Sequence, residues 1–139
     1  RVIVVSGPVD VVIIGFPGNK FTGKIAPAIK ELVENNTIRI LDLLFVTSDD
    51  TGTISALRVQ DLAADLQPGL VELDTFMPGA LDEHDAQELA EDLPANSSAL
   101  LVAFENVWAS KFVAAIQEAE AVVIDQIRIP ADAVADLLA

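Results

Sequence analysis

The chain has 139 residues, enough for one domain with its own hydrophobic core and short for two. A net charge of −14 disfavours nucleic acid as a partner, and the lack of cysteine excludes disulfides and thiolate chemistry. Hydrophobic residues make up 52% of the chain, yet no apolar run approaches the roughly 18 residues that a membrane span needs. With no signal-peptide pattern at its start, the chain is expected to be cytoplasmic.

The first segments predict an extension, a strand and a helix. Residues 1–6, RVIVVS, form an apolar N-terminal extension that pairs with its own sheet or with a neighbouring subunit. A Gly-Pro break separates this extension from a single domain over 7–139. The run Val9 to Phe16 is apolar on both alternating faces, which predicts a central strand. A helix follows, with Pro27 in its first turn.

A hairpin is predicted next. Ile38 to Val46 is a second apolar strand, and Ile54 to Gln60 is a third. The residues between them, TSDDTGT, predict a tight turn to which Asp50 and Gly52 supply the turn chemistry.

The second half begins with an irregular stretch that contains two Pro-Gly pairs. The elements expected after it are a helix with Asp82 as its N-cap, a strand over Ala99 to Glu105, a helix over Val107 to Ala119, a strand over Ala121 to Ile129 and a short helix opened by Pro130.

The order β-α-β-β-α-β predicts an α+β fold with a ferredoxin-like core, extended by one α-β unit, and a mainly antiparallel sheet. The strands are apolar on both faces, whereas the helices of this arrangement cover mainly one face. The other face then needs cover from a second subunit's sheet or from the terminal helix.

Four segments carry a family resemblance: GPVDVVIIGFPGNKFTG, LDLLFV, SSALLVAFEN with the following Trp108, and VVIDQIRIP. Together they resemble a small bacterial family of unknown function, similar to uncharacterised bacterial membrane proteins with a glycine-rich hairpin. The region that would hold this hairpin, Asp61 to Ala80, is short and polar, so the membrane role does not carry over. The resemblance implies a ferredoxin-like fold and no established activity.

The stretch GNKFTGKI matches a phosphate-binding loop at Gly18, Gly23 and Lys24 but has Ile25 where the magnesium-binding hydroxyl belongs. We interpret it as a strand-to-helix turn. Together with Lys20, these three residues still provide a candidate site for weak binding of a small anion at the start of the helix.

A second candidate ligand site is FENVWASK, where Glu105 and Asn106 end a strand and Trp108 begins a helix. The simpler interpretation places Trp108 and Phe112 in the core and makes Asn106 a helix cap. His84, the only histidine, lies between acidic residues on an exposed helix turn and predicts no metal site.

Six charged residues interrupt apolar strands; ion pairs across neighbouring strands are expected for them, and exposure at a sheet edge is the alternative for Asp42. The six residues are Asp10, Asp42, Asp125, Arg39, Arg58 and Arg128.

No catalytic set, cofactor or metal is predicted. The leading functional hypothesis is a non-enzymatic, self-assembling or protein-interaction module that forms a homo-oligomer. A small-ligand or ion-binding sensor, with a pocket that combines the two candidate sites, is the alternative.

Overall fold

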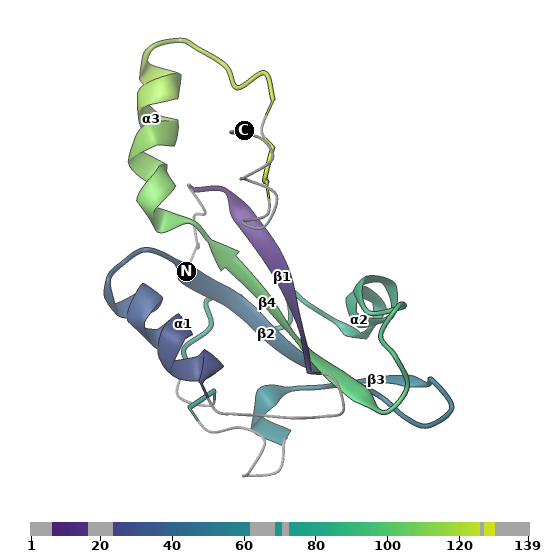
Figure 1. Ribbon diagram of the computed structural model, residues 1–139. Coiled ribbons are helices and arrows are strands. Elements are labelled where there is room, and N and C mark those ends of the chain that lie inside the picture. Colours follow the sequence, from purple (N-terminus) through teal and green to yellow (C-terminus); the bar gives the residue numbers. More distant parts are fainter. Residues whose placement is uncertain (1–6, 17–23, 62–68, 71–72, 126, 130–139) are drawn as a thin grey trace, which may run out of the picture.

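The computed structural model describes residues 7–16, 24–61, 69–70, 73–125 and 127–129 (Figure 1). Four strands form one antiparallel sheet in the order β1-β4-β2-β3. The strands are β1 (Val9–Phe16), β2 (Arg39–Ser48), β3 (Ile54–Leu57) and β4 (Ser97–Glu105). Together with α1 (Ile25–Glu34), α2 (Glu83–Leu89) and α3 (Ser110–Glu118), they confirm the α+β class.

The ferredoxin-like strand order is not confirmed. In a ferredoxin-like sheet, β3 lies between β1 and β2. Here one strand also lies between β1 and β2, but it is β4. The central pair is therefore β2 and β4, and β3 lies at the outer edge beside β2.

Both faces of the two central strands are covered by this same chain. On one face α1 packs over a cluster that includes Phe45, Leu100 and Val102. On the other, α2 and the segment before it cover Leu44, Leu101 and their neighbours, and Figure 1 shows α1 and α2 on opposite sides of the sheet. The second face was expected to be covered by a second subunit's sheet or by the terminal helix. For β2 and β4 this expectation is wrong, because α2 and the segment before it cover that face.

Strand β1 differs from the other long strands because it is half-exposed. It pairs with β4 in a register that places Val9 opposite Glu105 and Phe16 opposite Ser98. No other described strand pairs with it. Val9, Val11 and Ile13 are all more than two-fifths exposed. The prediction of a central strand was wrong for the described sheet. A strand with apolar side chains on both faces can also lie at the edge of a sheet, as β1 does among the described strands.

A buried carboxylate fastens the covering segment to the second face of the sheet. Asp42 is fully buried beside an irregularity of β2, and its Oδ2 accepts hydrogen bonds from the backbone N–H of Gly79 (3.1 Å) and of Leu81 (2.8 Å). Its Oδ1 accepts from Leu43 N–H, and the guanidinium of Arg58, one residue after β3, forms an ion pair with it. This confirms the predicted pairing of Asp42 across neighbouring strands.

The predicted helix cap and turn glycine are confirmed, but the carboxylate of the turn comes from the residue before the predicted one. Asp82 caps α2 in a capping box with Asp85. In the β2–β3 turn, Gly52 adopts a φ of 81°, but the carboxylate that organises the turn belongs to Asp49 instead of Asp50. Its Oδ1 accepts from the N–H and hydroxyl of Thr51 and from Thr53 N–H.

The strand predicted over Ala121 to Ile129 is not formed: the described residues of this stretch are neither helix nor strand. The predicted extension over 1–6 and the helix after Pro130 lie outside the described residues.

Candidate functional site

A polar cluster lies where β4 ends, opposite the start of β1. The carboxylate of Glu105 is buried, accepts a hydrogen bond from Gly7 N–H (2.7 Å) and forms an ion pair with Arg39, its register partner on β2. The Arg39 guanidinium also lies 4.8 Å from the centroid of the Phe76 ring, a cation–π geometry. Glu105, on β4, therefore links Gly7 by a hydrogen bond and β2 by an ion pair.

Asn106 extends this cluster to β1. Its side-chain amide donates to the carbonyl of Pro8 (3.0 Å) and to the carboxylate of Asp10 (2.8 Å), and its own carbonyl accepts from the Trp108 indole N–H (3.3 Å). The predicted cap is not made, because Asn106 forms no side-chain capping hydrogen bond to the short 3₁₀ turn Val107–Ala109. Arg128 completes the cluster with an ion pair to Asp10.

A cleft of about 340 Å³ opens beside the Arg39–Glu105 pair. Apolar side chains make most of its lining, and Asn36, Arg39 and Glu105 provide the polar groups. The lining residues are Val33, Asn36, Ile38, Arg39, Phe76, Glu105 and Val107. A cleft of this size and lining suits a small, mostly apolar molecule with a polar group.

The structure describes only part of the two candidate ligand sites of the sequence. Gly18, Lys20 and Gly23 lie outside the described residues, whereas Lys24 is exposed and precedes α1. The cleft beside Glu105 adjoins the other end of α1, about 15 Å away along a ten-residue helix. Lys24 therefore does not join Glu105, Asn106 and Trp108 in one pocket.

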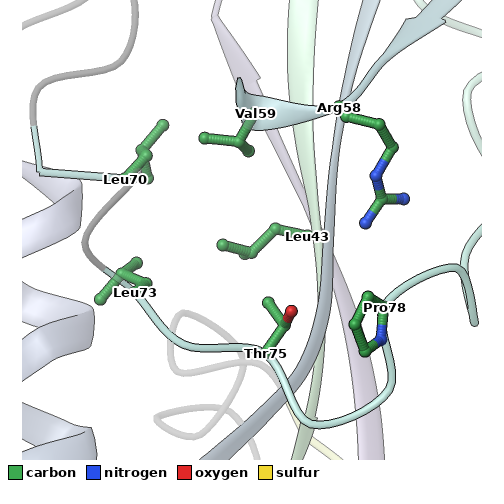
Figure 2. Close-up of a pocket in the computed structure, with 7 residues that line it drawn as sticks. All are labelled: Leu43, Arg58, Val59, Leu70, Leu73, Thr75 and Pro78. Carbon is green, nitrogen blue, oxygen red and sulfur yellow. The ribbon is translucent and has the colours of Figure 1, made fainter. Parts of the chain in front are cut away.

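A smaller cavity of about 130 Å³ lies beside the apolar cluster on the α1 face of the sheet (Figure 2). Leu43 and Val59 point towards Leu70 and Leu73, while the Arg58 guanidinium lies apart from them. Because that guanidinium is paired with Asp42, the Thr75 hydroxyl is the other polar side-chain group of the lining.

Trp108 and Phe112 are exposed by 64% and 67%, and no residue of α3 is buried. Figure 1 shows the reason: α3 stands away from the sheet beyond the end of β4. The expected core packing of these two rings is therefore wrong. Their helical spacing does make one apolar face, but that face has no partner within the described chain.

Exposed apolar side chains are concentrated in three segments of the described chain. We call them together the apolar surface: the exposed residues of β1, the aromatic residues of 107–118, and the C-terminal arm over 121–125 and 127–129. They provide eleven of the fifteen large hydrophobic side chains that are exposed in the described chain, namely Val9, Val11, Val12, Ile13, Trp108, Phe112, Val122, Val123, Ile124, Ile127 and Ile129. Sequence analysis missed the surface because it assigned β1, Trp108 and Phe112 to the core.

Two kinds of function find no support in the residues that the structure describes. They contain no group of three acidic or histidine side chains arranged to hold a metal ion. None of the described helices combines the length and the apolar character that crossing a bilayer requires.

These features define the class of the protein: an α+β domain with an open antiparallel sheet, whose polar strand-end cluster adjoins an exposed apolar edge. The chain belongs to DUF6325, a family of unknown function that matches residues 5–139. This confirms the predicted membership of a family of unknown function. A search of curated proteins and a search of solved structures returned no match.

Proposed function

We propose that this protein is a non-enzymatic self-assembling module whose copies associate through the apolar surface. The observation that carries the proposal is the concentration of exposed Val, Ile, Trp and Phe side chains on β1, α3 and the C-terminal arm. A concentration of exposed apolar side chains marks a binding interface more often than a free surface. A second copy is a suitable partner because the surface includes an edge strand, which can pair with its own kind.

The charge of the chain sets a condition on this association. Two copies that each carry a net charge of −14 repel one another, so the apolar contact has to exceed this repulsion. Salt screens the repulsion without weakening the apolar contact. Association should therefore strengthen as the salt concentration rises, whereas an interface built on ion pairs would weaken.

The test is the mass of the protein by light scattering over a range of concentrations at low and high salt. Val11→Lys and Ile13→Lys should each weaken association, and the added positive charge cannot explain this because it lowers the net repulsion. Leu32→Lys is the matched control, since Leu32 lies on α1 and is 42% exposed, close to the 45% of Val11. A monomer at every concentration and salt would refute the proposal.

The only tryptophan of the chain gives an independent signal. Trp108 is largely exposed in the single chain, so burial between copies should shift its fluorescence emission to shorter wavelength as the concentration rises.

A second candidate function, a small-ligand sensor, is favoured by the cleft beside Arg39 and Glu105. A ligand of this cleft should raise the melting temperature of the monomer, by an amount that grows with the logarithm of its concentration once its sites are nearly saturated. Phe76→Ala, which removes one wall of the cleft, should abolish this shift.

A further inference from the structure

A groove lies at the edge of the described sheet that is opposite β1. It has a volume of about 360 Å³ and lies between the end of β3 and the start of α2. Both central strands separate β3 from β1, and Figure 1 shows β3 and α3 at opposite ends of the sheet. The groove is therefore distinct from the apolar surface, and a partner that binds it is independent of the proposed self-association.

The floor of the groove is apolar. Leu44 and Leu81 belong to the buried cluster on the face of the sheet that α2 covers, and Ala56 packs against that cluster. Leu57, which is 39% exposed, also lines the groove. These residues offer apolar contact to the stem of a long side chain, whereas an open groove does not enclose a small molecule as a ligand pocket does.

Carboxylates border the groove on two sides. Asp61 ends the 3₁₀ turn that follows β3, whereas Asp82 and Glu83 lie at the start of α2. The Asp82 carboxylate caps this helix by accepting from Asp85 N–H (2.9 Å). Asp61 and Glu83 are exposed, and their carboxylates form no hydrogen bond or ion pair within the described part of the chain. These two carboxylates therefore remain available to a partner.

The charges around the groove favour a basic partner. Arg58 is the one cationic side chain among the described lining residues, and its guanidinium is paired with Asp42 and donates to the Leu81 carbonyl (3.2 Å). The border of the groove therefore stays negative, and a second copy of this chain, with a net charge of −14, is a poor occupant. A lysine or arginine side chain suits both parts of the groove, since its apolar stem covers the floor while its charged head meets the border.

We infer that the groove binds a basic peptide segment of a partner protein, whose lysine or arginine side chain lies between β3 and α2. The stem of that side chain covers Ala56 and Leu81, and its head pairs with Asp61 or Glu83. Exposed ion pairs of this kind are weak and are screened by salt. The interaction should therefore have low affinity and weaken as salt rises, which is the opposite of the salt dependence expected for self-association.

An NMR titration of the full chain tests the inference with a defined probe, the acetylated and amidated peptide Gly-Lys-Leu-Lys-Gly. Binding should shift the amide signals of Ala56, Gly79 and Glu83 in a saturable manner, and more than those of residues outside the groove. The same peptide with glutamate in place of lysine should not shift these signals. Higher salt should weaken the binding of the lysine peptide.

Paired variants separate the groove from the overall negative charge of the chain. Asp61→Asn with Glu83→Gln should weaken binding of the lysine peptide about fivefold, as expected for the loss of two exposed ion pairs. Asp50→Asn with Glu91→Gln is the matched control, because it removes the same charge from exposed positions outside the groove. The control pair should change the affinity by less than about twofold, through the long-range field alone.

The remaining outcomes each overturn the inference. Equal weakening by both pairs of substitutions would assign the binding to the field of the whole chain. Equal shifts with butylammonium would assign the groove to a small cation, and shifts that follow the protein concentration without peptide would assign it to a second copy. Absence of a saturable shift would also overturn it. Light scattering reports self-association separately, so a monomer that binds the peptide would keep this inference and refute the earlier proposal.

Discussion

The carboxylate of Asp42 should contribute more to stability than any other single polar group in the described chain. It is fully buried and accepts hydrogen bonds from the backbone of Leu43, Gly79 and Leu81, as well as from Arg58. Asp42→Ala leaves a guanidinium without its partner and removes the acceptor of three backbone N–H groups. Breaking a buried pair from one side costs about 3–5 kcal/mol, and we expect the lower end because the Arg58 side chain is 34% exposed.

The assay is urea unfolding of the original chain, Asp42→Ala, Arg58→Ala and the double variant. Because the double variant leaves no unpaired charge, its loss should be smaller than the sum of the single losses by more than about 1 kcal/mol. Asp42→Asn, which keeps the shape and one acceptor oxygen, should lose less than Asp42→Ala. A loss below about 1 kcal/mol for Asp42→Ala, or single losses that simply add, would refute the reasoning.

Three further outcomes are expected. Gly7→Ala should destabilise by about 1–3 kcal/mol in urea unfolding, because a Cβ there would lie 2.3 Å from a backbone carbonyl oxygen, whereas Gly15→Ala meets no atom within 4 Å and should be nearly neutral. Glu120→Gly should stabilise the monomer by about 0.5–1 kcal/mol, as it relieves the positive φ, and an unchanged unfolding midpoint would contradict this. Hydrogen bonds to the Asp49 carboxylate lower its pKa below the ordinary value. The Thr51 hydroxyl has the largest effect, and the Thr53 N–H has the next largest. This carboxylate therefore stabilises the native turn fully above about pH 3.9, and the stabilisation is lost as the pH falls through the lowered native pKa. Thr51→Val should raise that pKa in an NMR titration, and no change would refute the assignment.

Local signals in the sequence were enough to predict the elements whose cause is local. The N-cap at Asp82, the glycine of the β2–β3 turn and the helix with Pro27 in its first turn all follow from residues within a few positions of one another. The third helix was also predicted, since Trp108, Phe112 and Ile116 have helical spacing, but its packing was not. Periodicity indicates which side chains share a face, and it does not indicate whether the chain covers that face.

The same local signals could not predict features that depend on residues far apart in the sequence. The insertion of β4 between β1 and β2 decides that Val9 to Phe16 lies at an edge, and no local pattern specifies it. The cleft combines residues from four separate parts of the chain, including Phe76 from a stretch without regular structure. Asp42 did give a signal, because a carboxylate between two leucines in an apolar strand demands a partner, and the expected partner across the neighbouring strand was found.

The strand order also governs how the protein can fold during synthesis. The last strand to leave the ribosome, β4, is the one that every long-range pairing of the sheet requires: β1 and β2 each pair with it and not with one another. Until residue 105 has emerged, the described sheet can form no more than the β2–β3 hairpin, and an isolated hairpin is marginally stable in water. The apolar β1 is therefore without its native partner until β4 has emerged, and unpaired strand edges are prone to aggregate during that time.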